Sequence, residues 1–333
     1  MADNTDIIIP AYNAVEKLKK TIYSYGNNIK YHFIVVVDGD NLDYTPVKDF
    51  FKDVQDIDIY YLEENQGPGM ARNYGIDMAT RKYVTFIDSG DTIYNPFIYQ
   101  NVLNLIYQHP EYYMVSCAHY EMKETQLEVI GPTHNRMHGK FFVREFLNQF
   151  GIRFSQECSR LNEDIGFNFA ARGIAMSLAK QDNQDRILHL TDAIIVWEND
   201  PDSVTRLNNC AFYYQKNNEG LSKNGIHALN ILEKNNISDA YKNNIIYQIL
   251  PSLYIFYYSC VFVRPEFEQE MEAGAKIFFE YLKQHRFVID WKACLSDYNA
   301  QLKGVYTRPW DPFIEGIPDL SFKRWYLTHM IDN

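Results

Sequence analysis

Two carboxylates at the end of a short apolar run are the residues best suited to chemistry in this chain. Residues 83–91 read Tyr-Val-Thr-Phe-Ile-Asp-Ser-Gly-Asp, so Asp88 and Asp91 follow a strand-like segment with only small residues between them. A hard divalent cation prefers oxygen ligands and commonly takes one or two protein carboxylates together with substrate phosphates. Asp, Ser and Gly also form β-turns, and the segment taken alone favours a turn. The surrounding motifs shift the interpretation to a metal and diphosphate site.

A second pair of acids, Asp38 and Asp40, follows a Val-rich run. A carboxylate at the end of such a strand can accept hydrogen bonds from a base imide or from ribose hydroxyls. A solvated turn is a comparable alternative for these two residues on their own.

Residues 65–73, Asn-Gln-Gly-Pro-Gly-Met-Ala-Arg-Asn, place glycines at a predicted strand-to-helix junction. Helix starts favour anions, and Arg72 adds a fork of donors for a base carbonyl, a phosphate or a neighbouring acid. A plain helix start with an arginine ion pair is the simpler alternative. The spacing matches neither the P-loop nor the dinucleotide-binding motif.

Alternating elements in the first half must position these residues. Apolar β-type runs are separated by segments with helical spacing, which predicts an α/β fold with a doubly wound, mostly parallel sheet. Ligands of such sheets bind beyond the carboxyl ends of the strands. The predicted strands are 6–9, 33–37, 57–62, 83–87 and 113–117, and the predicted helices are 14–25, 45–52, 67–80 and 96–108.

The second half changes character along its length. We expect a hairpin and a loop over 118–136, helices over 141–150 and 163–172, and a strand over 187–197. Long helical patterns then run from 211 to 297, before a tail rich in proline and aromatic residues. These patterns place a domain boundary near residue 207, between an N-terminal α/β domain over 1–206 and a helical C-terminal domain over 207–333.

Composition narrows the class of protein. The 333 residues are 46% hydrophobic and 23% charged, as in globular proteins with a substantial core. The formal net charge of -11 argues against a broad electrostatic grip on nucleic acid. The five cysteines are scattered without a C-x-x-C pair, so neither a disulfide framework nor a zinc knuckle is indicated.

We expect the protein to act in the reducing cytoplasm. Residues 1–6 carry acids where a signal peptide needs basic residues, and the apolar run after them is short. The uncharged stretch 243–263 contains Pro251, Gln248 and four tyrosines, which favours a buried aromatic helix over a membrane span. Peripheral contact with a membrane is the alternative for this stretch.

Four ordered motifs together resemble those of the inverting family 2 glycosyltransferases of the GT-A fold. They are residues 7–13 (IIIPAYN), 37–40 (VDGD), 65–73 (NQGPGMARN) and 86–91 (FIDSGD). The resemblance covers roughly residues 6–206, which is a plausible size for one domain. It implies that the domain over 1–206 is catalytic and that the helical domain over 207–333 serves acceptor binding or oligomerisation.

This resemblance implies a nucleotide-sugar donor, a UDP-sugar, and a divalent cation, Mn²⁺ or Mg²⁺, near Asp88 and Asp91. The family commonly reads Asp-Ser-Asp-Asp where this chain has Gly90 in the third position. Either Asp91 supplies the metal contact with altered geometry, or metal dependence is weakened. The donor-binding residues that it implies are Pro10, Tyr12, Asn13, Asp38, Asp40, Gly67, Arg72, Asn73, Asp88, Ser203 and Arg206.

Residues 161–167 (LNEDIGF) look like the family's Glu-Asp motif at a helix start. An inverting transfer needs a carboxylate to remove the proton of the acceptor hydroxyl as its oxygen attacks the anomeric carbon. We assign this role to Asp164 and a supporting one to Glu163. Acids also favour helix N-termini for structural reasons, and that is the alternative.

Two loops are candidates for further contacts. Residues 201–206 resemble the segment after the family's last core strand, where Ser203 and Arg206 can touch the diphosphate, although a simple loop is equally consistent. Thr133, His134, Asn135, Arg136 and His138 form a polar loop that can border the acceptor. A histidine metal site is possible in this loop, but nearby histidines are more often polar surface.

Three other functions remain as alternatives. A nucleotidyltransferase on a similar sheet would need a Gly-rich basic loop after the first strand, where this chain has Pro10-Ala-Tyr-Asn13. A sugar-nucleotide-binding protein without catalysis is suggested only by Gly90. For the acceptor we expect a bacterial surface glycan or a protein, and a phage-type enzyme that modifies hydroxymethylated DNA bases is the alternative. Aromatic residues of the tail can stack on sugars or bases, although core packing or homo-oligomerisation explains them more simply.

Overall fold

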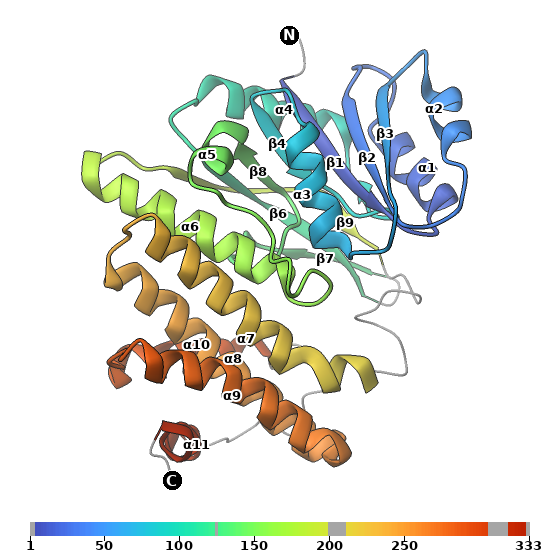
Figure 1. Ribbon diagram of the computed structural model, residues 1–333. Coiled ribbons are helices and arrows are strands. Elements are labelled where there is room, and N and C mark those ends of the chain that lie inside the picture. The colour runs from blue at the N-terminus through green and yellow to red at the C-terminus, as the bar shows by residue number, and fades with distance from the viewer. Residues whose placement is uncertain (1–3, 124–125, 199–210, 306–318, 331–333) are drawn as a thin grey trace. The chain divides into compact units, whose positions relative to one another are not determined.

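The computed structural model describes residues 4–123, 126–198, 211–305 and 319–330 (Figure 1). The chain divides into two compact units. The N-terminal unit is Met1–Arg160 with Phe167–Pro201, and the C-terminal unit is Leu161–Gly166 with Asp202–Asn333. The predicted boundary near residue 207 lies outside the described residues.

A nine-stranded mixed sheet forms the centre of the N-terminal unit, with strand order β3-β2-β1-β4-β8-β6-β9-β5 and β7 paired to β6. The first four strands in this order are parallel, and β6 and β9 are also parallel, whereas β8 runs antiparallel to both of its neighbours. The α/β prediction with a mostly parallel sheet is therefore confirmed. The strands are β1 (Thr5–Ala11), β2 (His32–Asp38), β3 (Asp56–Leu62), β4 (Tyr83–Phe86), β5 (Thr92–Ile93), β6 (Met114–Lys123), β7 (Gln126–Ile130), β8 (Lys140–Val143) and β9 (Ile187–Trp197).

The crossover helices explain why the central parts of β1 and β2 are apolar on both faces of the sheet. Right-handed crossovers place α1 and α2 on one face of the parallel strands and α3 on the other (Figure 1). Ile7, Ile8 and Ile9 of β1 are consequently all fully buried. The helices associated with the sheet are α1 (Val15–Ser24), α2 (Thr45–Phe51), α3 (Pro68–Met78), α4 (Pro96–Gln108), α5 (Arg144–Gln149) and α6 (Glu163–Asp182).

Close packing of α3 on the sheet depends on a glycine. A Cβ atom at Gly75 would lie 2.4 Å from Cγ2 of Ile8, so no larger residue fits at this point of the helix without moving the strand. This contact brings α3 against β1, and α3 carries the predicted donor-binding residues Arg72 and Asn73.

One predicted element is wrong in part. Residues 141–150 were expected to form one helix, but 140–143 form β8, and only 144–149 are helical. Phe141 and Phe142 are almost fully buried between β4 and β6, and aromatic and β-branched residues suit a central strand. The apolar spacing of residues 141–150 fits a helix, and this local pattern does not show that residues 140–143 pair with β4 and β6.

Other boundaries differ in length rather than in kind. The strand predicted over 113–117 extends to Lys123 and forms a hairpin with β7, which agrees with the hairpin expected after residue 118. The helix predicted over 163–172 continues to Asp182. The strand over 187–197 is found as predicted.

The C-terminal unit is helical, as the sequence patterns predicted. None of its described helices, nor any other in the described ranges, is long and apolar enough to cross a membrane. The stretch 243–263 lies in a helix with Pro251 in its interior, and Tyr247 and Tyr254 are buried. The elements are α7 (Ala211–Lys234), α8 (Asp239–Val263), η1 (Pro265–Phe267), α9 (Glu268–Gln284), α10 (Trp291–Val305) and α11 (Asp319–Met330).

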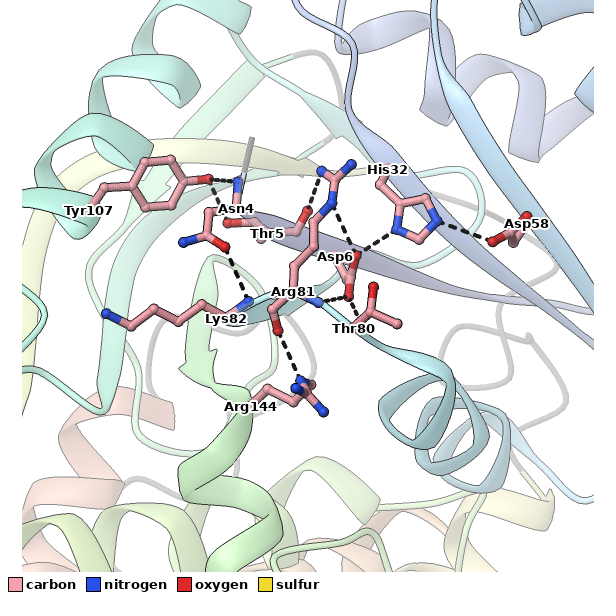
Figure 2. Close-up of polar contacts among 10 residues, drawn as sticks. All are labelled: Asn4, Thr5, Asp6, His32, Asp58, Thr80, Arg81, Lys82, Tyr107 and Arg144. Atoms are coloured by element: carbon pink, nitrogen blue, oxygen red, sulfur yellow. Dashed lines mark hydrogen bonds and ion pairs between the residues drawn. The ribbon is translucent and has the colours of Figure 1, made fainter. Parts of the chain in front are cut away.

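A buried carboxylate anchors the amino ends of the parallel strands (Figure 2). Asp6, which is fully buried, accepts hydrogen bonds from the backbone amides of Thr80 (2.7 Å) and Arg81 (2.8 Å). It also lies 2.6 Å from Nδ1 of His32, whose Nε2 is 3.3 Å from Asp58. This network ties the start of β1 to the start of β2 and to the turn before β4. It lies at the edge of the sheet opposite the one where ligands bind, so its role is structural.

The Asp6–His32 pair predicts a defined pH dependence of stability. Hydrogen bonding to Asp6 raises the pKa of His32 above its ordinary value of 6.5, although burial opposes it. Burial alone would raise the pKa of Asp6, but the bonds from His32, Arg81 and Thr80 outweigh it and lower that pKa below 3.8. The stabilisation from His32 is complete below pH 6.5 and is lost as the pH rises through its raised pKa. The contribution of Asp6 is complete above pH 3.8 and is lost in acid.

We therefore expect His32→Gln to reduce the loss of unfolding free energy between about pH 5.5 and about pH 8.5, as measured by urea denaturation. His109→Gln is the matched control, because the His109 side chain is 44% exposed. An unchanged pH slope in the His32 variant would show that the pair does not contribute as described.

Candidate active site at the carboxyl edge of the sheet

The predicted site residues converge because their strands are parallel neighbours. Ile8 of β1 lies beside Phe86 of β4, and Ala11 of β1 lies beside Val37 of β2. The segments that follow β1, β2 and β4 therefore leave the sheet at one edge (Figure 1).

The turn that carries both acids is held from two sides. Oγ of Ser89 donates to the carbonyl of Pro10 (2.6 Å), and the amide of Gly90 donates to Oγ1 of Thr21 (2.9 Å). Thr21 in turn donates to the carbonyl of Asp91 (2.8 Å). Gly90 has a φ of +111°, a conformation that side-chain-bearing residues rarely adopt. The glycine that replaces the family's usual acid is thus required by this backbone geometry.

Asp88, Asp91 and His138 each offer one ligand atom, and these three atoms lie within 4.8 Å of one another. Oδ2 of Asp91 is buried without a hydrogen-bond partner and lies 3.4 Å from Nε2 of His138. Burial raises the pKa of Asp91, while His138 counteracts part of this effect. A buried carboxylate oxygen without a donor fits a cation, so this donor set can hold a divalent metal. We refer to these three residues as the metal-ligand group.

Aromatic neighbours hold the His138 ring in place. The His119 ring stacks on it at a centroid distance of 5.2 Å, and the Trp197 ring lies at 5.3 Å. Arg136 covers Trp197 at 5.0 Å from its centroid. Burial lowers the pKa of His119 to about 2, so this ring is neutral where it touches His138. The loop itself is tied to the buried Lys140, whose Nζ donates to the carbonyl of Thr133 (2.7 Å).

From the sequence, His138 was expected in a polar loop that can border the acceptor, with a histidine metal site there only as the less common alternative to polar surface. A single histidine before a strand has no motif that marks it as a ligand. Its role depends on β8 lying next to β4, an adjacency that the predicted helix over 141–150 concealed.

Arg72 orients the first carboxylate of the group. Its guanidinium is 2% exposed, donates to Oδ1 of Asp88 (2.7 Å) and lies over the Phe154 ring at 5.4 Å. Asp88 is half exposed. Burial alone would raise the pKa of Asp88, but the charges of Arg72 and His138 outweigh it and lower that pKa. Asp88 is thereby kept ionised, as a metal ligand must be.

Asp38 serves as the anion at the start of α3. Its two carboxylate oxygens accept the amides of Gln66 (2.7 Å) and Gly67 (2.8 Å), and the amide of Gly69 is bonded to the carbonyl of Ser159 (2.9 Å). Burial raises the pKa of Asp38, and the two amides offset only part of that effect. The sequence suggested that the start of α3 binds a substrate anion. In the structure, amides at this helix start are instead hydrogen-bonded to groups of the protein itself.

Gly67 is required at this turn. It has a φ of +93°, and a Cβ atom there would lie 2.4 Å from the Arg160 side chain. The predicted donor residue Asn73 forms two hydrogen bonds with the backbone of Phe154, at 2.8 and 2.9 Å. Asn73 thus fastens α3 to the segment that leads toward α6.

Asp40 organises the loop after β1. It accepts from the amide of Asn13 (2.6 Å) and from the hydroxyl of Tyr44 (2.8 Å). Asn13 has a φ of +50°, and Tyr12 before it is 52% exposed. The loop therefore presents the Tyr12 ring to solvent beside the carboxyl edge of β1.

Glu163 and Asp164 are the first two residues of α6. They belong to the C-terminal unit, whereas the metal-ligand group belongs to the N-terminal unit. Ser203 and Arg206 lie outside the described residues.

A curled, mostly parallel sheet with this edge defines an α/β protein of the GT-A type. Residues 6–163 match the family model described as "Glycosyl transferase family 2", and this part of the chain belongs to that family. The family predicted from the four motifs is thereby confirmed.

Curated relatives match short segments. The putative teichuronic acid biosynthesis glycosyltransferase TuaG of Bacillus subtilis is 34% identical over 90 residues, which cover 26% of this chain and 35% of TuaG. An uncharacterised glycosyltransferase of Rickettsia conorii is 30% identical over 119 residues, which cover 33% of this chain and 19% of that protein. The chain thus matches about a third or less of the length of these relatives.

Solved structures share the fold over nearly the whole chain. Residues 1–349 of Staphylococcus aureus TarS, in complex with UDP, superpose with a TM-score of 0.62 at 16% identity, covering 92% of this chain and 91% of that one. The mannosyltransferase PcManGT of Pyrobaculum calidifontis, in complex with GDP-Man and Mn²⁺, gives a TM-score of 0.54 at 12% identity, covering 98% and 86%. At these identities the comparison shows the fold alone.

Proposed function

We propose that this chain is an inverting glycosyltransferase that moves a sugar from a nucleotide-sugar donor to an acceptor hydroxyl. The observation that carries the proposal is the metal-ligand group at the carboxyl edge of a family 2 sheet. Asp88 there is oriented by the buried Arg72, and Asp91 has a buried oxygen without a hydrogen-bond partner. A decayed, non-catalytic site would have no reason to keep such a costly arrangement.

The bound cation is proposed to be Mn²⁺ or Mg²⁺, held by Asp88, Asp91 and His138. When bound, it neutralises the diphosphate that leaves with the nucleotide. The structure supports the need for a cation at the diphosphate. Arg72 is already paired with Asp88, and the amide of Gly67 before α3 is already bonded to Asp38. The imidazole in the donor set favours Mn²⁺ over Mg²⁺, which prefers oxygen ligands.

A UDP-sugar is the proposed donor. TarS structures with UDP and with UDP-GlcNAc have the same fold, and this supports the uridine nucleotide. Pro10, Asp38 and Arg72 are proposed to contact the donor, and the exposed Tyr12 ring offers a face on which the base can stack. PcManGT binds GDP-Man, so a guanosine donor is the competing outcome.

Asp164 is the proposed general base, with Glu163 in a supporting role. The acceptor hydroxyl gives its proton to the Asp164 carboxylate as its oxygen bonds to the anomeric carbon. The bond from that carbon to the diphosphate breaks in the same step, and the nucleoside diphosphate leaves with the electron pair. One displacement inverts the carbon, so an α-linked donor yields a β-linked product.

The proposed acceptor is a bacterial surface glycan. The relative TuaG is named for teichuronic acid biosynthesis, and this supports a polymer of that chemical kind. The net charge of -11 weighs against DNA as the acceptor.

The test is a donor screen with and without Mn²⁺. UDP- and GDP-sugars are offered with glycan, peptide and hydroxymethylated-DNA acceptors, and products are identified by mass spectrometry. We expect Mn²⁺-dependent transfer from a UDP-sugar to a glycan, with a β-linkage by NMR. Nucleotide binding without turnover would reject the enzyme, and an α-linked product would reject the inverting mechanism.

The His138 ligand makes a separate prediction. We expect His138→Ala to weaken Mn²⁺ binding in the presence of UDP by at least about 10-fold, since a nitrogen donor is lost from the group. Isothermal titration with Mn²⁺ measures this affinity. His134→Ala, in the same loop and packed against His189 instead, should leave it unchanged. Equal affinities for the His138 variant and the wild type would remove His138 from the metal site.

A further inference from the structure

Buried amides line one helix of the C-terminal unit. Asn217, Asn218 and Asn224 of α7 are all fully buried, as is Ser222 between them. Burying a polar side chain is unfavourable unless it is hydrogen-bonded, so three buried amides and one buried hydroxyl on one helix indicate specific partners.

Two of these asparagines hold the segment that precedes Asp164. Nδ2 of Asn224 donates to the carbonyl of Leu161 (3.1 Å). Nδ2 of Asn162 donates to the carbonyl and to Oδ1 of Asn217, both at 3.1 Å. Asn162 has a φ of +58°, and its own carbonyl accepts the amide of Ile165 (3.1 Å) at the start of α6. The two residues directly before Glu163 are therefore fixed by α7.

Gly166 closes the same contact from the other side of Asp164. A Cβ atom at Gly166 would lie 2.8 Å from the Asn224 carbonyl and 3.0 Å from its Oδ1. Only glycine allows the first turn of α6 to approach α7 this closely. The segment 161–166 is thus held to α7 both before and after Asp164.

The other two polar residues hold α7 itself. Nδ2 of Asn218 donates to the carbonyls of Leu253 (3.1 Å) and Met271 (3.2 Å). Oγ of Ser222 donates to the carbonyl of Gly274 (2.8 Å). These hydrogen bonds connect α7 to α8 and α9, so the helix that contacts segment 161–166 is itself bonded to the rest of the helical unit.

We infer that Asn162 and Asn224 are positioning residues for the general base, and that the C-terminal helices serve as its scaffold. This inference rests on the proposed function for the role of Asp164. It gives the helical unit a part in catalysis that is separate from acceptor binding or oligomerisation. A base must be held within hydrogen-bonding reach of the proton it takes, so loosening its segment slows turnover without weakening donor binding.

The test compares three variants of the full chain. Asn162→Gly keeps the left-handed backbone conformation and removes both side-chain bonds to Asn217. Asn224→Ala removes the bond to Leu161. Asn218→Ala is the matched control, because it deletes an equally buried amide of the same helix that bonds only α8 and α9 among the contacts described above.

Hydrolysis of UDP-GlcNAc in the presence of Mn²⁺ measures turnover, titration with UDP and Mn²⁺ measures binding, and thermal melting measures stability. We expect kcat to fall about 10- to 100-fold in Asn162→Gly and Asn224→Ala, with UDP affinity within about twofold of wild type. Asn218→Ala should lower the melting temperature while keeping kcat within about twofold. A kcat for Asn162→Gly that equals wild type, or an equal fall in Asn218→Ala, would overturn the inference.

Hydrogen exchange tests whether α7 orders segment 161–166, and it does so whether or not the chain is a glycosyltransferase. We expect amides of residues 163–166 to exchange at least about 10-fold faster in Asn162→Gly and Asn224→Ala, and at the wild-type rate in Asn218→Ala. If the wild-type chain hydrolyses no nucleotide sugar, the proposed function fails, and the exchange rates still decide whether α7 orders the segment. Unchanged exchange in all three variants would reject the scaffold even if the chain is active.

Discussion

Replacing Asp91 by alanine should abolish metal-dependent sugar transfer, with turnover falling at least about 100-fold at saturating donor. Asp91 is 5% exposed, and its Oδ2 is buried, 3.4 Å from Nε2 of His138 and without a hydrogen-bond partner. Removing it takes away a proposed metal ligand that Gly90 cannot replace, since Gly90 has no side chain and a φ of +111°. Initial rates over a range of Mn²⁺ concentrations measure the effect.

The expected defect can be distinguished from misfolding. Asp77→Asn is the matched control, because Asp77 lies in α3 of the same unit and pairs with Arg153 at 2.9 Å. It should retain the wild-type Mn²⁺ dependence. Full activity in the Asp91 variant would refute Asp91 as a metal ligand. The second alternative would then hold, namely that the glycine at position 90 weakens the dependence on metal.

Asp164→Asn should lower turnover by about 10²- to 10⁴-fold and leave the affinity for UDP and Mn²⁺ unchanged. Asparagine keeps the size of the side chain and its place at the start of α6 but cannot accept the acceptor proton. The exchange removes only a charge that favours the first turn of α6, so a purely structural role of Asp164 predicts a small loss of stability and little change in turnover. Single-turnover rates at saturating donor measure the step.

Glu163→Gln is the comparison for this second prediction, since the two acids are adjacent in the first turn of α6. We expect a smaller loss than for Asp164→Asn, in keeping with a supporting role. A larger loss in the Glu163 variant would exchange the two assignments. Equal activity of Asp164→Asn and wild type would remove the general base from this segment.

The parallel half of the sheet could be predicted from the sequence because it depends on local patterns. β1, β2 and β4 contain short apolar runs, β3 (DIDIYYL) mixes acids with apolar residues, and the helices between the strands have apolar spacing. Their polar ends fall at one edge for any parallel arrangement, so Asp38 and Asp88 could be placed near each other before the structure was known. β8 was not predicted, because its place between β4 and β6 depends on partners distant in the sequence.

The same distinction holds within the site. Asp88 and Asp91 are close in sequence. Two carboxylates at the end of a strand predict a site for a divalent cation from the residue types alone. His138 joins them from a loop that is 47 residues beyond Asp91 in the numbering, through the pairing of β8 with β4. Asp38 shows the same limit: its motif predicts a donor contact, which stays a prediction, and only the structure shows that its two oxygens accept the amides of Gln66 and Gly67.

The sequence by itself determined the α/β class, the family of residues 6–163 and the acids suited to a metal and a base, since periodicity and short motifs are local properties. Only the tertiary structure shows that His138 lies close to Asp88 and Asp91 and that α7 is hydrogen-bonded to the segment carrying Asp164. Both depend on contacts between residues far apart along the chain. Such contacts form because buried polar atoms must find partners and packed elements must fit, and neither condition is expressed in a local pattern.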